Sequence, residues 1–423
     1  MDLQPPRGTL DLLPPEGSRI RALYDRAAAL ARLHGYHYVE TPGFEGTELF
    51  ARTSGETSDV VSKEMYTFED RGGRSVTLRP EGTAPVMRAY LGQHQQQPSP
   101  FKAYYLTRMY RYSRPQQGRY REHRQFGIEV FGTDDPGADV EVMAVGDAFL
   151  RGLGLTRIEL EVNSLGDGVC RPAYREELLA FLRANRARLT DQHKDRFEEN
   201  PLRVLDCKDE DCRAVAAEAP TMLDHLCDPC REHFDTVLAG SKEAGLSPVV
   251  TPTLVRGLDY YTRTAFEFVS PGLSPQQATL FGGGRYDGLA ELLGGPRVPG
   301  VGFGMGLERV LMALEDEGVE PPEEPKLMAF VVGVGDAGRV RARELVRDLR
   351  AAGVAADTSF EDRPLKAQLK MADRAGATYA AIVGERELEA GTVTLRRLAD
   401  GEQDEVAVPE LVERLRSRTS GEA

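Results

Sequence analysis

Basic side chains that could bind phosphate are concentrated in one segment of an otherwise acidic chain. Between positions 102 and 124 there are seven Lys or Arg residues and a single acid, Glu122, whereas the formal net charge of the 423-residue chain is −14. A local reversal of sign this strong is typical of a place where phosphates are handled. On charge alone, a solvated surface face is the more common explanation. The basic residues are Lys102, Arg108, Arg111, Arg114, Arg119, Arg121 and Arg124.

The residue types in this segment predict an antiparallel hairpin with a long basic loop. Tyr, Leu and Thr favour a strand over Ala103–Tyr112, and Pro and Gly predict a turn over Ser113–Gly118. Alternating residue types then predict a returning strand over Arg124–Phe131. Arg111 would lie beside an amide and a carboxylate of the returning strand. Such a set could hold a phosphate and an amine in one pocket.

Three further segments carry residues suited to a ligand site. The sequence RGLDYY at 256–261 places an arginine and two tyrosines on a turn, where they could bind a phosphate beside a flat substrate or form a buried ion pair with core aromatics. Leu280–Leu289 contains three consecutive glycines, which either let a ligand approach the backbone or form a tight turn. Gly300–Val310 predicts a glycine-rich strand that runs into a helix, where Arg309 could meet a terminal phosphate.

The rest of the sequence indicates the domains that must position these residues. We expect a first domain over 1–320, in which residues from about 170 to 240 are charged and mostly helical and form an insertion. Residues 321–325 are a Pro- and Glu-rich linker. Residues 326–417 alternate as β-α-β-α-β, followed by two strands and a helix, which predicts a small α/β domain. A tail is expected at 418–423.

Composition argues against several classes of protein. The N-terminal stretch lacks the apolar or Arg- and Ser-rich character of a targeting peptide, and no apolar run approaches the roughly 20 residues that cross a bilayer. Five cysteines in a chain of this length do not form a disulfide framework, which favours a reducing cytoplasm. The acidic balance argues against a general nucleic-acid binder but permits a specific one with a local basic surface.

Four cysteines in the predicted insertion raise the question of a metal. The spacing of Cys207, Cys212, Cys227 and Cys230 is compatible with a tetrahedral zinc site. Buried cysteines also serve as small apolar residues. We predict no catalytic metal at these positions and leave structural zinc open.

Together these segments resemble the three signature motifs of class II aminoacyl-tRNA synthetases. RGLDYY, Arg79–Ala84 (RPEGTA) and Gln125–Glu129 (QFGIE) narrow the resemblance to the histidyl-tRNA synthetases, and it covers essentially the whole chain. The resemblance implies an α+β catalytic domain, with an antiparallel sheet flanked by helices, and a C-terminal α/β anticodon-binding domain. It also implies a cytoplasmic homodimer that activates histidine with ATP and Mg²⁺ and transfers it to the 3′ end of tRNA(His).

The resemblance implies which arginines contact ATP. Arg111 would hold the α-phosphate and Arg309 the γ-phosphate. Arg256 would lie across the α-phosphate and stabilise the charge that builds there. Arg119 would also bind ATP. In the same loop, the side chains implied for the acceptor end of the tRNA are Arg114 and Gln116.

A second set of residues is implied for histidine. Glu81 and Thr83 would bind its α-amino group, whereas Glu129 and Tyr261 would satisfy both imidazole nitrogens. This chain has His123-Arg124 where the family often has an aromatic residue followed by His, so one neighbour of the site departs from the pattern. The histidine-binding residues implied are Glu81, Gly82, Thr83, Gln125, Glu129, Tyr260 and Tyr261.

Two alternatives belong to other classes of protein. A catalytically inactive, histidine-sensing regulatory paralogue would usually lack the C-terminal domain and key arginines, whereas Arg111, Arg256 and Arg309 are all present here. A dinucleotide-dependent oxidoreductase is suggested by Gly333–Gly338, which matches G-x-G-x-x-G. The C-terminal domain is too small for a dinucleotide site, so we expect a simple strand-to-helix turn there.

Overall fold

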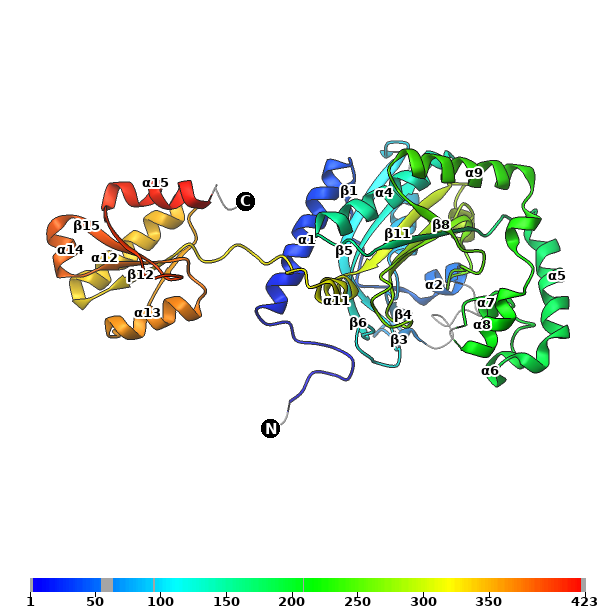
Figure 1. Ribbon diagram of the computed structural model, residues 1–423, viewed down its shortest axis with the longest axis horizontal. Coiled ribbons are helices and arrows are strands. Elements are labelled where there is room, and N and C mark those ends of the chain that lie inside the picture. The colour runs from blue at the N-terminus through cyan, green and yellow to red at the C-terminus, as the bar shows by residue number, and fades with distance from the viewer. Residues whose placement is uncertain (1–2, 55–63, 94–95, 208, 420–423) are drawn as a thin grey trace. The chain divides into compact units, whose positions relative to one another are not determined.

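The computed structural model describes residues 3–54, 64–93, 96–207 and 209–419 of the chain. These residues form two units, Met1–Glu323 and Glu324–Ala423 (Figure 1). None of the described helices is long and apolar enough to cross a membrane.

The first unit is built on a large, mainly antiparallel sheet. Its strands lie in the order β1 (His37–Tyr38), β5 (Phe101–Tyr110), β6 (Glu122–Phe131), β11 (Gly300–Gly306), β10 (Thr279–Arg285), β9 (Thr262–Val269), β7 (Glu159–Ser164) and β8 (Pro248–Val250). Neighbours from β5 through to β7 are antiparallel, and the two edge pairs are parallel. β5 and β6 form the predicted hairpin.

Helices cover one face of this sheet. They are α1 (Glu16–Leu33), α4 (Pro136–Gly152), α9 (Asp228–Glu243) and α11 (Leu307–Glu317). Their apolar sides share one core with the sheet residues that point toward them, including Phe126 and Ile128 of β6. Because side chains alternate along a strand, Gln125 and Glu129 of β6 point to the opposite face. α11 ends at Gly318, whose φ of 69° closes the helix.

The opposite face carries the candidate site and is covered by shorter elements. α3 (Thr83–Leu91) and α10 (Leu289–Leu292) flank a second apolar cluster that contains Tyr105, Tyr260 and Tyr286. Helix α2 (Thr47–Ser54) packs beside α3 through Phe50 and Ala84. A small sheet lies beside α2 and consists of β2 (Phe44–Gly46), β4 (Ser75–Leu78) and β3 (Tyr66–Glu69).

Between β7 and β8 the chain leaves the sheet and forms a helical lobe, drawn in green in Figure 1. The lobe contains α5 (Arg171–Ala184), α6 (Asp191–Lys194), α7 (Leu202–Leu205) and α8 (Glu210–Ala217). It has a core of its own, in which Leu178 and Val204 are fully buried. Although α9 begins in this stretch, it buries Phe234 and Val237 against the main sheet. The lobe's own core therefore ends near Cys230.

The second unit is the predicted α/β domain. Its sheet order is β13 (Ala356–Thr358), β12 (Ala329–Gly333), β14 (Tyr379–Val383), β15 (Thr392–Arg397) and β16 (Gln403–Ala407). The first three strands are parallel and the last two are added antiparallel. The helices are α12 (Gly335–Ala351), α13 (Leu365–Arg374), α14 (Glu385–Ala390) and α15 (Val408–Thr419). The sequence did not predict α14, and residues 420–423 of the predicted tail lie outside the described residues.

The glycines at 333–338 form a turn from β12 into α12. Gly335 has a φ of 73°, which favours glycine. A Cβ atom on Gly338 would lie 2.7 Å from the carbonyl oxygen of Val383, so glycine permits α12 to pack closely on β14. These contacts explain the glycine spacing as the expected strand-to-helix turn.

A buried network of charges joins β10 to the helical side of the sheet. Arg285 and Asp139 are both fully buried and form an ion pair. His233 lies 3.5 Å from Asp139, and Asp287 accepts a 3.1 Å hydrogen bond from Arg285. Burial alone would raise the pKa of Asp139, but the Arg285 guanidinium outweighs burial and holds this pKa below its usual value. Arg285 is therefore a structural residue.

Replacing Arg285 with Met should destabilise the first unit severely. The substitution leaves the buried carboxylate of Asp139 without its counter-charge, and breaking such pairs typically lowers the free energy of unfolding by about 3–5 kcal/mol. Chemical denaturation of the full chain measures the change. The matched control is Arg297→Met, which removes an exposed pair with Asp134 and should cost at most about 1 kcal/mol. Equal effects of the two substitutions would contradict a structural role for Arg285.

Candidate active site

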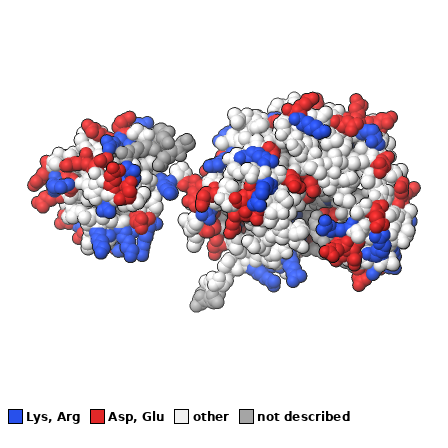
Figure 2. Space-filling model, viewed as in Figure 1, with Lys and Arg blue, Asp and Glu red and all other residues white. Residues whose placement is uncertain are grey.

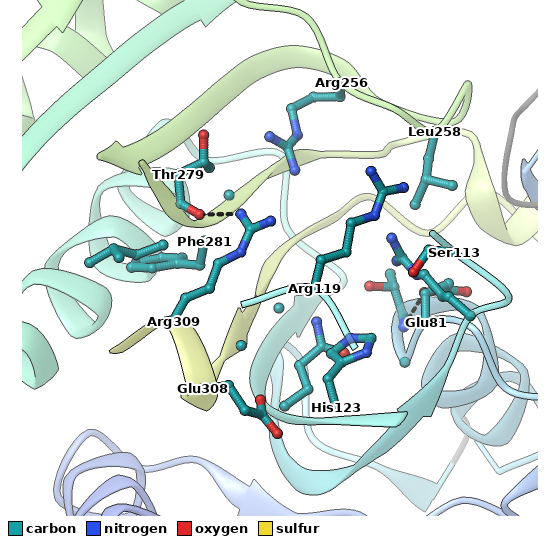
Figure 3. Close-up of a pocket in the computed structure, with 18 of the residues that line it drawn as sticks. Glu81, Ser113, Arg119, His123, Arg256, Leu258, Thr279, Phe281, Glu308 and Arg309 are labelled. Atoms are coloured by element: carbon teal, nitrogen blue, oxygen red, sulfur yellow. Dashed lines mark hydrogen bonds between the residues drawn. The ribbon is translucent and has the colours of Figure 1, made fainter. Parts of the chain in front are cut away.

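A cavity of about 310 Å³ opens on the glycine-rich face of the large sheet. Its walls come from the start of α3, the loop between β5 and β6, the turn before β9 and the junction of β11 with α11 (Figure 3). Most of the residues predicted to bind ligands therefore come together, although they are distant in sequence. Those on the cavity lining are Glu81, Gly82, Thr83, Arg111, Arg119, Gln125, Arg256, Tyr260, Tyr261 and Arg309.

A row of glycines gives the cavity a floor without side chains. Gly127, Gly304 and Gly282 are cross-strand partners on β6, β11 and β10. A Cβ atom on Gly282 would overlap the Arg256 guanidinium, and one on Gly304 would overlap the Gln125 amide. The glycines thus let these side chains lie directly against the backbone. The glycine run that contains Gly282 is part of a strand, so the alternative of a tight turn is wrong.

Arginine side chains converge on the cavity. In Figure 3 the guanidinium groups of Arg119, Arg256 and Arg309 point into the same space. Arg256 forms an ion pair with Glu267 of β9, and Arg119 forms one with Glu64 at 2.6 Å. These carboxylates orient two of the guanidinium groups toward the cavity.

Backbone carbonyls hold the other two arginines. The Nε atom of Arg111 donates a hydrogen bond to the oxygen of Pro80 at 2.7 Å. Arg309 donates to the carbonyl oxygens of Gly118, at 3.2 Å, and Thr279. A neutral carbonyl fixes the direction of a guanidinium group without cancelling its charge, so both charges remain directed at a ligand.

The crowding of like charges favours an anionic ligand. Burial lowers the pKa of Arg309, and the guanidinium groups of Arg119 and Arg111 lower it further. Burial and the neighbouring arginines lower the pKa of His123 to about 3, so its ring is neutral at neutral pH. A bound polyanion would relieve this repulsion.

Three buried polar atoms on the cavity wall have no hydrogen-bond partner among the described residues. They are Nε of Arg256, Oε1 of Gln125 and Oγ of Ser113. Buried polar atoms in folded proteins are nearly always hydrogen-bonded. Donors and an acceptor without hydrogen-bond partners in one cavity indicate positions where a ligand would form hydrogen bonds.

Glu81 provides a carboxylate suited to an amine. It is buried, and it accepts hydrogen bonds from the backbone N–H groups of Thr83 at 2.6 Å and Ala84 at 3.0 Å. Burial raises its pKa to about 7, although these two hydrogen bonds oppose the shift. A nearby cation such as an α-ammonium group would favour the ionised form.

Glu129 lies beneath the cavity wall, not on the lining. Its carboxylate accepts a 2.8 Å hydrogen bond from the hydroxyl of Thr83 and another from the hydroxyl of Tyr286. Burial raises its pKa to about 8, against the effect of these two bonds. Tyr286 is thus a phenol that contacts Glu129, and it was not among the residues predicted for the site. The ring of Tyr261 lies 6.1 Å from that of Tyr286.

Arg114 and Gln116 lie in the loop between β5 and β6, outside the cavity lining. Both are exposed, and a short bridge between Gln116 and Arg119 shapes the turn. The Arg121 guanidinium stacks 3.8 Å from the ring centre of Tyr112 and supports the base of the loop. The loop is therefore accessible to a large partner.

The sequence reasoning missed several residues of the site, among them Tyr105, His123, Glu267 and Tyr286. Alternation along β5 could have found Tyr105, because it pairs with Gly127 on the ligand-facing side. Glu267 and Tyr286 gave no local signal. Their roles depend on contacts with residues on other strands, which only the folded sheet brings close.

The four cysteines considered for zinc do not form one cluster. Cys207 and Cys212 group with His193, whereas Cys227 and Cys230 group with residues just before α5. The four cysteines therefore do not share one tetrahedral site. The spacing in sequence did not reveal this division, because the partners of each pair lie elsewhere in the chain.

The glycine-floored antiparallel sheet, its arginine-bearing hairpin and an arginine at the start of the helix after the last strand define the catalytic domain of a class II aminoacyl-tRNA synthetase. The sequence matches the family described as histidyl-tRNA synthetase over residues 8–310 and an anticodon binding domain over residues 328–418. The chain belongs to the histidyl-tRNA synthetase family.

Known proteins are similar along the whole chain. The histidine–tRNA ligase of Moorella thermoacetica is 50% identical over 410 residues, which cover 96% of each chain. That of Halothermothrix orenii is 45% identical over 417 residues, 98% of this chain and 99% of the relative. The crystal structure of apo S. aureus histidyl-tRNA synthetase superimposes with a TM-score of 0.81 at 36% identity, covering 98% of this chain and 99% of that one. The predicted family and fold class are confirmed.

Replacing Arg256 with Ala should lower histidine-dependent ATP–pyrophosphate exchange by about 10²–10³-fold, the usual cost of losing one preorganised charge-stabilising donor. The melting temperature should change little, because Thr279 still donates a 2.9 Å hydrogen bond to Glu267. Arg183→Ala, which removes an exposed ion pair with Glu198, is the control and should leave exchange intact. A fall in melting temperature that accounts for the lost exchange would make Arg256 structural.

The KM for histidine should rise as the pH falls below about 7. The raised pKa of Glu81 means that its carboxylate is protonated below this pH and can no longer attract an ammonium group. Well below the pKa, the rise approaches about tenfold per pH unit. The imidazole of free histidine titrates in the same range, so Glu81→Gln is the control. An unchanged pH profile in this variant would assign the effect to the substrate alone.

Proposed function

We propose that the chain activates L-histidine with ATP to histidyl-adenylate and transfers the histidyl group to the 3′ end of tRNA(His). The observation that carries this function is one cavity that combines a crowded set of arginines with a buried carboxylate suited to an amine. Membership of the histidyl-tRNA synthetase family supports the same reaction. The anticodon binding domain supports a tRNA partner.

In the first step, a carboxylate oxygen of histidine attacks the α-phosphorus of ATP. A new oxygen–phosphorus bond forms as the bond to the bridging oxygen breaks, and pyrophosphate leaves with the electron pair. The nucleophile is already ionised, so this step needs no general base. Catalysis then rests on positioning and on electrostatic stabilisation of the charge on the transferred group.

The arginines supply this stabilisation. Arg111 and Arg256 contact the α-phosphate from two sides, and Arg309 contacts the γ-phosphate. Arg119 lies in the same cavity and adds positive charge near the leaving pyrophosphate. Because Glu267 holds Arg256 and backbone carbonyls hold Arg309, these groups are oriented before ATP arrives. Little reorganisation is then needed as charge develops.

Histidine binds at the other side of the cavity. Glu81 and Thr83 receive the α-ammonium group, and the open amide oxygen of Gln125 lies within the same cavity. Tyr260 and Tyr261 form the wall that faces the imidazole. Glu129 fixes that wall through Thr83 and Tyr286, and is available to the ring if Tyr286 moves aside. A pocket built from hydrogen-bonding groups rejects analogues that lack the imidazole nitrogens.

In the second step, a hydroxyl of the terminal ribose of the tRNA attacks the carbonyl carbon of the adenylate, and AMP leaves. Arg114 and Gln116 in the exposed loop contact the acceptor end.

The second unit contacts the anticodon. Figure 2 shows Lys and Arg side chains gathered along the lower edge of this unit, where Figure 1 places α13. α13 carries the exposed residues Lys366, Lys370 and Arg374.

Mg²⁺ would be held by the phosphates of ATP and would help to neutralise the charge of the leaving pyrophosphate. The carboxylates that line the cavity are already bound by protein donors: Glu64 by Arg119, Glu81 by backbone N–H groups, and Glu308 by Arg124. Each of these three described carboxylates thus already has a protein partner, which does not favour a separate metal site on the lining. The chain itself neutralises the phosphate charge of ATP with its arginines.

We also propose a homodimer in the cytoplasm. Large apolar side chains are exposed on the N-terminal part of the first unit, where Leu33, Tyr38 and Phe44 are 82%, 51% and 55% exposed. Apolar side chains this exposed are suited to burial by a second copy of the chain. The five cysteines are free thiols, which suits a reducing compartment.

The regulatory paralogue is not favoured. Curated histidine–tRNA ligases match nearly the whole chain at 45–50% identity, and the arginines expected to be lost in such a protein line the cavity. The second unit, which a regulatory paralogue usually lacks, is also present.

Amino-acid-dependent ATP–pyrophosphate exchange, screened over the twenty amino acids, tests the proposal. Exchange should occur with histidine and with no other amino acid. Charging should then follow with tRNA(His) and not with a mixture of other tRNAs. If the protein binds histidine but gives no exchange, the proposed reaction is refuted and the regulatory role is supported.

A further inference from the structure

A second group of chemically reactive side chains lies outside the cavity, where the helical lobe joins the main sheet. The ligand atoms of Asp167, Cys170, Cys227 and Cys230 all lie within 4.8 Å of one another. Four donors from two separate segments, one carboxylate and three thiols, match the number and type of ligands of a structural zinc site. A tetrahedron with Zn–S bonds of about 2.3 Å separates its corners by about 3.8 Å, so only a small contraction is needed.

We propose that Asp167, Cys170, Cys227 and Cys230 bind one zinc ion in tetrahedral coordination. The ion joins the two ends of the helical lobe, and no part of this role depends on the reaction in the cavity. The four ligands come as two matched pairs. Each pair is separated by two residues, and each lies at the start of a long helix, α5 for the first and α9 for the second.

The first pair lies in a loop that is shaped around the sulfur atom. Gly166 adopts a φ of 60°, and a Cβ atom there would lie 2.6 Å from the Sγ atom of Cys170. The backbone N–H of Asp167 donates to the same sulfur at 3.2 Å. N–H groups directed at sulfur are a feature of metal-thiolate loops, because they stabilise the thiolate.

The Asp167 carboxylate is already oriented by its neighbours, which suits it to act as a metal ligand. Its Oδ1 atom accepts a 2.9 Å hydrogen bond from the backbone N–H of Val169 and lies 3.5 Å from the sulfur of Cys170. A carboxylate held in place within reach of the neighbouring sulfur can serve as a fourth metal ligand beside the three thiols.

The second pair supplies a buried and a half-buried thiol. Cys230 is 1% exposed, and Cys227 is the residue that precedes α9. A divalent cation would favour the deprotonated form of all three thiols at once.

The site is connected to the wall of the cavity. Arg171, the residue after Cys170, donates hydrogen bonds to the carbonyl oxygens of Leu165, at 2.9 Å, and Tyr261. A zinc ion that fixes the start of α5 would therefore also fix the carbonyl of a tyrosine in the cavity wall.

The other cysteine group is a weaker candidate and gives a matched control. His193, Cys207 and Cys212 provide three ligands, and the sulfur of Cys212 lies 3.4 Å from the hydroxyl of Thr190. Replacing Cys207 and Cys212 with Ser changes two thiols in the same lobe but leaves the proposed site intact.

Metal analysis of the full chain, purified without chelators from cells grown with added zinc, tests the proposal. About one zinc per chain is expected, and the Cys207→Ser/Cys212→Ser protein should keep it. Cys230→Ser should fall to background. Replacement of zinc by Co²⁺ should give the visible bands of tetrahedral cobalt with thiolate ligands, in the wild type and in the control alone.

A variant that strengthens the site guards against loss of metal through misfolding. Asp167→Cys supplies a fourth thiolate, so its zinc should resist a chelating competitor about tenfold or more longer than that of the wild type. Zinc near background in the wild type would overturn the proposal. So would zinc that is lost from the Cys207→Ser/Cys212→Ser protein and retained by Cys230→Ser, or a disulfide between any two of the proposed ligands in freshly purified protein.

Discussion

The active site depends on a single row of residues that crosses five strands. Cross-strand pairing aligns Tyr105, Gly127, Gly304, Gly282 and Glu267 on β5, β6, β11, β10 and β9. The three central positions have no side chain, and Tyr105 at one end of the row lines the cavity. Arg256 lies over the last glycine and is held by the carboxylate at the end of the row. A Cβ atom at any central position would displace the group above it, so the sheet register itself sets the width of the cavity.

Buried charge is fully paired within the protein on one face of the large sheet and only partly paired on the other. On the helical face, Arg285 is matched by Asp139 and Asp287 and further supported by carbonyl oxygens, so its charge is fully satisfied. On the ligand face, Arg309 is near other guanidinium groups, and a buried atom of Arg256 has no hydrogen-bond partner among the described residues. Folding tolerates this arrangement because the charges are few and open to the cavity. The binding energy of an anion then replaces the missing partners.

Short motifs in the sequence indicated residues that line the cavity, whereas contacts made across strands could not be predicted. The hairpin around Arg111 could be placed from alternation and turn residues alone, and RGLDYY located Arg256 on a turn before a strand. By contrast, the contact between Glu129 and Tyr286 could not be predicted, because the two residues are 157 positions apart along the chain. The division of the cysteines into two groups has the same cause, since spacing in sequence does not show which loop each thiol meets.

The loop that precedes α5 also constrains the cavity wall. Arg263 follows the two tyrosines of the wall and has a φ of 49°, an uncommon conformation for a residue with a side chain. Hydrogen bonds hold it on both sides: its N–H donates to Gly166 at 2.7 Å, and its carbonyl accepts from Leu165 at 2.6 Å. The register of β9 with β10 shifts beside this residue, as expected at a β-bulge. Since strain of this kind persists only where the surroundings enforce it, the loop before α5 determines how the tyrosines are presented. The hydrogen bonds of Arg263 therefore connect the loop that leads into the helical lobe to the active site, although the lobe has a separate core.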